Sequence, residues 1–131
     1  MSAMTMVDQL ESLFQALGDR TRLRLLNLLA GGEICVCFLV EVLGEPQPKI
    51  SRHLAYLRRE GLVEARRDGK WIHYRLAEPA SPLVDTVLKA VTSALCCEKT
   101  MQRDREALGR ACCNVPKSLR DAPMPVLGAR S

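Results

Sequence analysis

Apolar residues recur at helical spacing along the first half of the chain. The first run has the i, i+3, i+4 and i+7 spacing of an amphipathic helix and consists of Leu10, Leu13, Phe14 and Leu17. Gly18 can cap the carboxyl end of this helix. A second helix is predicted over 22–29, capped by Asp19 or Thr21, and its many leucines favour a largely buried position. A short third helix of two or three turns is predicted over 33–43.

The segment 48–60 predicts a fourth helix with two distinct faces. Its apolar face carries, at helical spacing, Ile50, Leu54 and Leu57. Its other face is polar, basic and aromatic, and carries Lys49, Arg52, His53 and Tyr56. One face should therefore pack on the core while the other meets solvent or a ligand.

Alternating residues after this helix predict a β-hairpin. The strands are expected over 63–67 and 70–76, with a two-residue turn at Asp68 and Gly69. The apolar face of the second strand consists of Ile72, Tyr74 and Leu76. The opposite face, which can meet solvent or a ligand, carries Trp71, His73 and Arg75.

A last helix is predicted from Ser81 or Pro82 onward. Its long apolar face needs a partner and consists of Leu83, Val84, Val87, Leu88, Val91 and Leu95. Residues 114–131 contain three prolines and no periodicity, so we expect a mobile end. The chain therefore divides into one folded unit over 1–97 and a cysteine-containing extension over 98–131.

Positive charge is concentrated in the middle of the chain. Its 131 residues suffice for one domain, and of the net charge of +4, residues 47–76 carry +5. This excess suits an anionic partner, although the same charges could serve only solubility. No apolar run reaches the ~18 residues of a membrane span, and residues 1–8 lack the features of a secretory signal. We expect a cytoplasmic protein without a membrane partner.

The six cysteines fall in three close pairs, which are Cys35 and Cys37, Cys96 and Cys97, and Cys112 and Cys113. In a reducing cytosol, such pairs indicate thiolate sites rather than disulfides.

The order of elements, with a basic helix directly followed by a charged hairpin, is that of a winged helix-turn-helix. Three segments closely resemble the ArsR/SmtB family of bacterial metal-responsive repressors: EICVC at 33–37, QPKISRHLAYLRREGL at 47–62 and KWIHYRL at 70–76. The EICVC segment is similar to that of the arsenic-responsive branch. The resemblance implies a mainly α fold with a β-hairpin wing. It also implies a repressor of an arsenic-resistance operon that leaves DNA when arsenite or antimonite binds.

Members of this family are homodimers through their first and last helices, which suits the two apolar stripes of this chain. The alternative is that both stripes fold back onto the core of one chain.

DNA binding would give specific tasks to the polar residues of 47–76. We expect base contacts from Gln47, Ser51, Arg52 and His53, with Lys49 and Tyr56 on the same helix face. From the wing, phosphates or the minor groove would be held by Arg66, Arg67 and Lys70. Trp71 would steady the hairpin, and His73 could contact DNA or pack. The alternative for the helix is an ordinary solvated face.

Arsenite and antimonite are thiophilic and favour three thiolates. Cys35 and Cys37 match the first two thiols of the arsenic-responsive segment, whereas Val40 replaces the family's third cysteine. Residues two apart on a regular helix point about 200° apart, so this helix must start late or distort if both thiols bind one ion. The third ligand could be water-derived, or come from either protomer's Cys96, Cys97, Cys112 or Cys113. The later cysteines could also form a separate site, and Cys35 and Cys37 could simply be small buried hydrophobic residues.

Other functions fit the sequence less well. A redox sensor on the same scaffold is the main alternative, because neighbouring thiols can be oxidised. Zinc sensing on the last helix is disfavoured, because that helix lacks histidine. An arsenic-handling enzyme is disfavoured by the lack of a Cys/His catalytic arrangement, a phosphate loop or a carboxylate pair. No organic cofactor is expected.

Overall fold

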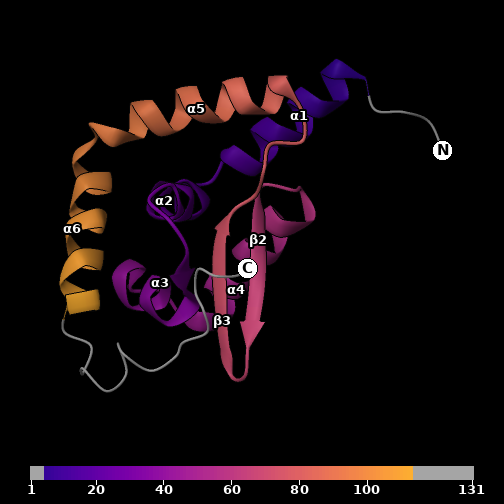
Figure 1. The fold of residues 1–131 in the computed structure, drawn as a ribbon. Coiled ribbons are helices and arrows are strands. Elements are labelled where there is room, and N and C mark those ends of the chain that lie inside the picture. Colours follow the sequence, from indigo (N-terminus) through magenta and orange to yellow (C-terminus); the bar gives the residue numbers. More distant parts are fainter. Residues whose placement is uncertain (1–4, 114–131) are drawn as a thin grey trace.

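The computed structural model describes residues 5–113 (Figure 1). The elements in this range are α1 (Met6–Leu17), α2 (Arg20–Leu29), β1 (Ile34–Cys35), α3 (Val36–Leu43), α4 (Gln47–Arg59), β2 (Val63–Asp68), β3 (Trp71–Leu76), α5 (Pro82–Cys96) and α6 (Lys99–Cys113). The mobile end expected for residues 114–131 lies outside the described residues. None of the helices within residues 5–113 is long and apolar enough to cross a membrane.

Helix α2 lies at the centre of the core, as its leucines predicted. Leu25 and Leu26 are fully buried, and the apolar face of α4 packs against them with three equally buried residues, Ile50, Leu54 and Leu57. Helix α1 adds Leu13 and Leu17 to the same core. The hydrophobic pattern thus predicted both the elements and their inward faces.

Local capping explains where the first two helices meet. Gly18 caps the end of α1, as predicted. The Asp19 carboxylate then accepts a 3.0 Å hydrogen bond from the Arg22 backbone amide. This cap starts α2 at Arg20, two residues earlier than predicted.

The antiparallel sheet has the strand order β1-β3-β2. The hairpin turn was expected at Asp68 and Gly69, but Asp68 pairs with Trp71 and the turn lies one residue later, at Gly69 and Lys70. Gly69 adopts a left-handed φ of 63°, which glycine reaches without the cost of a Cβ. The left-handed glycine therefore occupies the first turn position.

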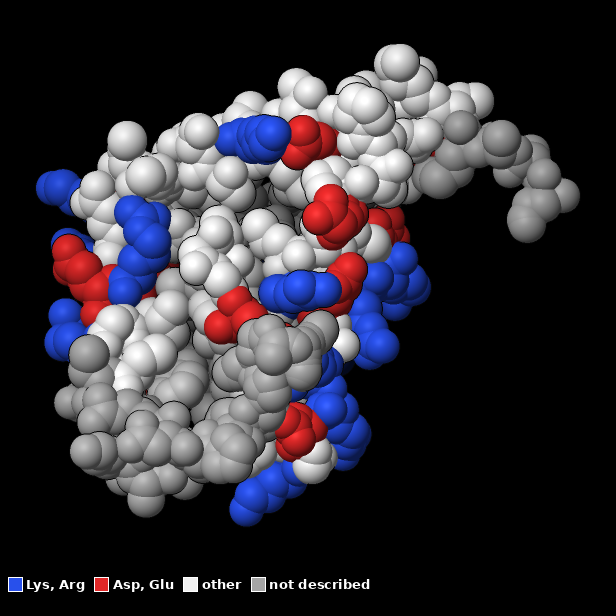
Figure 2. Space-filling model, in the orientation of Figure 1, with Lys and Arg blue, Asp and Glu red and all other residues white. Residues whose placement is uncertain are grey.

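Helix α5 has no fully buried residue, although four of its apolar side chains pack partly against the core: Val84, Val87, Leu88 and Val91. Near its start, the Ser81 hydroxyl lies 3.4 Å from Gln9 of α1. Helix α1 leaves Met6, Val7 and Phe14 exposed, the last by 56%. Figure 2 shows few charged side chains over these two helices. A single chain therefore covers the apolar faces of α1 and α5 only in part.

Helix α6 was not anticipated. It descends beside α2 and α3 (Figure 1). Arg24 of α2 donates hydrogen bonds of 2.7 and 2.9 Å to the Asp104 carboxylate, and Asn27 donates to the Met101 carbonyl at 3.1 Å. Polar anchors hold this helix as much as apolar ones, so a search for hydrophobic stripes does not find it.

Candidate functional site

The polar face of α4 points outward, as predicted. Gln47 and Arg52 are exposed, and the residues half-buried beside them are Lys49, Ser51, His53 and Tyr56. Figure 2 shows Lys and Arg side chains gathered along the edge formed by α4 and the hairpin. This face and the hairpin tip form one basic surface.

Arg22 of α2 holds α4 in place from behind this surface. Its Nε and Nη2 donate to the carbonyl oxygens of Ala16 and Gln15 at 2.7 and 3.0 Å. Its Nη1 lies 3.3 Å from His53 Nδ1, and its guanidinium lies 4.3 Å from the centre of the Tyr56 ring. Sequence patterns give no sign of this role of Arg22, because it arises from contacts between α1, α2 and α4.

His53 is a partly buried residue of this surface. Burial lowers its pKa below the usual 6.5, and the positive charges of Arg22, Lys49 and Arg52 lower the pKa further, while Asp19 opposes them. Its Nε2 lies 3.8 Å from Asp19 Oδ2. Both ring nitrogens therefore face groups of the same chain, which leaves Gln47, Ser51 and Arg52 as the more open of the expected base-contacting residues.

Two of the three basic side chains predicted to contact DNA from the wing are exposed. Arg67 and Lys70 are exposed at the hairpin tip, and the Lys70 ammonium lies 5.8 Å from the centre of the Trp71 ring. Arg66 instead donates two hydrogen bonds of 3.0 Å to the Glu33 carboxylate. Arg66 therefore ties the wing to the residue that precedes β1 rather than extending from the tip.

His73 lies on the strand face that was expected to meet solvent or a ligand, yet only 2% of its surface is exposed. The structure thus favours packing for this residue, because β1 adds to the sheet beside β3 and pairs Cys35 with His73. Arg75, two residues further along the same face, is exposed.

Cys35 and Cys37 come together because α3 starts late. A late start was one of the two expected ways in which both thiols could bind one ion, the other being a distorted helix. Cys35 ends β1 with φ −69° and ψ 141°, and α3 begins at Val36. The Cys37 thiol donates to Cys35 Sγ at a sulfur to sulfur distance of 3.2 Å. Cys35 is buried and Cys37 is exposed, so the pair is reached from the Cys37 side.

The two thiols differ in acidity. The hydrogen bond from Cys37 lowers the pKa of Cys35 to about 7, against the opposing effect of burial, and the backbone amides of Cys37 and Ile72 contribute to the lowering. The same hydrogen bond raises the pKa of Cys37. A single thiolate shared by two sulfurs is therefore favoured near neutral pH.

The later cysteines do not complete this pair within the described residues. Cys96 and Cys97 are exposed at the end of α5, and Cys112 is exposed on α6. Cys113 belongs to α6, but its side chain lies outside the described residues. Among the side chains that the structure describes, which exclude that of Cys113, no three of His, Cys, Asp or Glu are placed to hold one metal ion.

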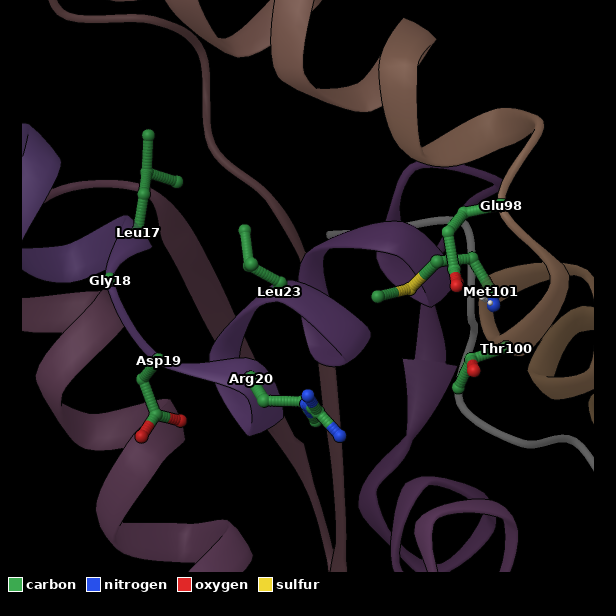
Figure 3. A pocket seen from close by; sticks show the side chains of 8 residues that line it. All are labelled: Leu17, Gly18, Asp19, Arg20, Leu23, Glu98, Thr100 and Met101. Atoms are coloured by element: carbon green, nitrogen blue, oxygen red, sulfur yellow. Dashed lines mark hydrogen bonds between the residues drawn. The ribbon is translucent and has the colours of Figure 1, made fainter.

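A separate hollow of about 390 Å³ lies where the α1–α2 junction faces the α5–α6 junction (Figure 3). It is lined by Leu17, Gly18, Asp19, Arg20, Leu23, Glu98, Thr100 and Met101. Arg20 points toward Thr100 and Met101, whereas Asp19 points away from them. No cysteine or histidine lines this hollow, so it is distinct from the thiol pair.

Residues 19–65 match the family model described as bacterial regulatory protein, arsR family. The chain is 49% identical over 82 residues to the arsenic resistance transcriptional regulator ArsR1 of Pseudomonas putida, covering 62% of this chain and 64% of that protein. It is 56% identical over 66 residues to the arsenical resistance operon repressor of Escherichia coli, covering 50% of this chain and 56% of that protein. The match thus spans less than two thirds of either relative.

The fold is similar to a solution structure of a homodimeric winged helix-turn-helix DNA-binding domain from Mycobacterium bovis, described as a possible ArsR-family transcriptional regulator. The TM-score is 0.56 at 31% sequence identity, over 72% of this chain and 89% of that chain. These similar proteins are transcriptional regulators by name rather than enzymes. The winged helix-turn-helix prediction is confirmed.

Proposed function

The chain belongs to the ArsR family of bacterial regulatory proteins, and from this premise we propose that it represses an arsenic-resistance operon from the cytoplasm as a homodimer. Binding of trivalent arsenic or antimony to the thiolates of Cys35 and Cys37 releases the operator. The contact of 3.2 Å between these two sulfurs carries the proposal.

The operator is held by α4 and the wing. Gln47, Ser51 and Arg52 face the base edges in the major groove, because short polar groups and guanidinium groups pair with them. Lys49, Arg67 and Lys70 neutralise phosphates. Two recognition helices related by a dyad would lie about 34 Å apart, so the operator is an imperfect inverted repeat with half-sites about one helical turn apart.

The second copy of the chain covers α1 and α5. The support is the exposed apolar group of Met6, Val7 and Phe14, and the absence of a fully buried residue along α5. Such a patch is rarely left open to water in a soluble protein.

The thiol pair is placed to influence α4 through a short path. Cys35 ends β1 and Cys37 stands in the first turn of α3, and Gly44, Glu45 and Pro46 alone separate α3 from α4. A centre bonded to both sulfurs fixes the start of α3 and changes its packing. Release requires that arsenic or antimony bind the DNA-free conformation more tightly than the DNA-bound one. The coupling free energy between the two binding events is typically about 1–3 kcal/mol.

Fluorescence anisotropy tests this function directly. Fully reduced protein is bound to labelled DNA from its own promoter at fixed salt, because affinity for DNA falls steeply with salt. Arsenite, antimonite, zinc and a mild oxidant are then titrated separately. Release by arsenite and antimonite alone is the expected result, and failure to bind this DNA at all would overturn the repressor function.

Matched serine variants locate the thiol site. C35S and C37S should bind the operator with unchanged affinity and lose the response to arsenite, whereas the combined C96S and C97S variant should respond normally. A normal response from C35S or C37S would move the site to the later cysteines.

A redox switch on the same scaffold is a second candidate, favoured by the lowered pKa of Cys35 beside Cys37. A thiolate in contact with a second sulfur is disposed to oxidation. Release by the mild oxidant alone, reversed by a thiol reductant, would support this candidate over metalloid sensing.

A further inference from the structure

His73 has a ring nitrogen that the fold leaves without a partner. The residue is 2% exposed, and its Nε2 is, among the described residues, the buried side-chain nitrogen or oxygen that has no hydrogen-bond partner. A buried polar atom without a partner destabilises the fold, so such an atom in a folded protein calls for a reason.

The sheet register places this ring beside the thiol pair. Cys35 of β1 lies directly opposite His73 of β3, while Ile34 lies opposite Tyr74. Directly opposite residues of antiparallel strands project from the same face, with Cβ atoms about 4.5–5.5 Å apart. Cys35, the Cys37 sulfur that contacts it and His73 thus share one face of the sheet.

Arsenite that is bonded to two thiols keeps one hydroxyl group, which the site must accommodate. Arsenite, As(OH)₃, and two thiols give two As–S bonds and two molecules of water, with the thiol protons leaving in the water. Arsenic stays trivalent and keeps one hydroxyl. Because no third donor is placed with this pair among the side chains that the structure describes, this hydroxyl persists unless another group replaces it.

We propose that His73 Nε2 is the hydrogen-bond partner of the hydroxyl that remains on arsenic bound by Cys35 and Cys37. This inference rests on the proposed function and names the third group of its site. A hydroxyl both donates and accepts, so either tautomer of a neutral imidazole can bond to it. The ring need not be an arsenic ligand, in keeping with the lack of a three-donor cluster among the described side chains.

The burial of His73 favours the uncharged ring. Burial lowers the pKa of His73, and Arg66 lowers it further, while Glu33 and Asp68 oppose this effect. The hydrogen bond would also connect the start of α3 to β3, which belongs to the wing. Inducer binding would thereby reach both DNA-binding elements at once.

Comparison of two arsenicals isolates the hydroxyl. Phenylarsine oxide bonds to two thiols with loss of one water and carries a phenyl carbon as its third substituent, so no hydroxyl remains. We measure release of operator DNA by arsenite and by phenylarsine oxide with the wild-type protein, H73F, H73L and H73Q. Y74F, altered at the next residue and on the opposite face of β3, is the matched control.

The criterion is the ratio of the two midpoints, because a general change in folding or DNA affinity alters both midpoints together. H73F and H73L should raise the arsenite midpoint relative to the phenylarsine oxide midpoint by about tenfold, the value of one hydrogen bond of about 1.4 kcal/mol. H73Q should bring the ratio part of the way back to its wild-type value, because the glutamine amide can bond to the hydroxyl. Y74F should leave the ratio unchanged.

An unchanged ratio in H73F and H73L would overturn the role of His73. Failure of the proposed function would look different, because the wild-type protein would then respond to neither arsenical, or C35S and C37S would respond to both.

Discussion

The Arg66 guanidinium of β2 meets the Glu33 carboxylate through two parallel hydrogen bonds, each 3.0 Å long. Both side chains are largely buried, with 14% and 12% of their surfaces exposed. Glu33 directly precedes β1, which ends at Cys35, so this pair joins the wing to the segment that bears the thiols.

We expect E33A and R66A each to lower the free energy of unfolding by about 1.5–3 kcal/mol, since each leaves a desolvated charge with lost hydrogen bonds. Urea unfolding followed by circular dichroism measures this loss. The Glu64–Arg75 pair on the same hairpin is the control, because its side chains are 45% and 51% exposed. E64A should cost at most about 1 kcal/mol, and equal losses at the two pairs would contradict the importance of burial.

Replacing Cys37 by alanine should raise the pKa of Cys35 from about 7 toward its usual 9.0, because the hydrogen bond that stabilises the Cys35 thiolate is lost. The thiolate absorbance in the ultraviolet, followed against pH, measures this change. The comparison is made in a protein whose four later cysteines are serine, so that Cys35 and Cys37 are the only thiols. An unchanged titration on removal of Cys37 would mean that the backbone amides alone set the acidity.

Asp19 gives the fold a stability that depends on pH. Burial raises its pKa, but the hydrogen bond from the Arg22 amide and the charges of His53 and Arg22 outweigh burial, so the pKa lies below the usual 3.8. The charged form therefore stabilises the fold fully above about pH 4, and this stability is lost as the pH falls through the lowered value.

Two substitutions separate the cap from the charge. D19A should lose about 0.5–2 kcal/mol at neutral pH, the usual value of a helix cap, whereas D19N keeps a capping oxygen and should lose less. In acid titrations of stability, the difference between wild type and D19N should shrink below pH 4. A constant difference would show that the Asp19 charge does not contribute.

We infer that the folded unit extends through α6. Asp104, whose side chain is 7% exposed, accepts both hydrogen bonds from Arg24, so D104A should destabilise the protein by about 3 kcal/mol and leave Arg24 without its partner. D85A breaks an exposed pair with Lys89 and should change stability by at most about 0.5 kcal/mol. Thermal unfolding of both variants gives the comparison, and a neutral D104A would make α6 a dispensable extension.

DNA titrations separate base contacts from phosphate contacts. R52A should cost about 1–3 kcal/mol on the operator and reduce the preference for operator over unrelated DNA. R67A should weaken binding to both DNAs equally and lower the salt slope by about one. The control is R58A, since Arg58 lies near the end of α4 and outside the predicted contacts. A uniform loss for R52A would make it another phosphate contact.

Apolar spacing was sufficient for the hairpin and for the helices α1 to α5, because it fixes which face of an element turns inward. The exception is the start of the third helix, where Ile34 and Cys35 form β1 instead. The resemblance to a repressor family came from three sequence segments rather than from periodicity. Chain order then placed the basic helix next to the wing. The sequence likewise required that the helix at Cys37 start late or distort if both thiols bind one ion, since the 3.6-residue period separates positions two apart. These conclusions depend on interactions among near neighbours in the chain.

Contacts between distant residues decided the rest. His73 is buried because β1 pairs beside β3, Arg66 is held by a carboxylate 33 residues away, and α6 is fixed by an aspartate 80 residues from Arg24. Periodicity assigns a side chain to a face but carries no information on what covers that face. The burial of His73 and the partners of Arg66 and Asp104 therefore follow only from the tertiary packing, which brings their elements together and excludes water between them.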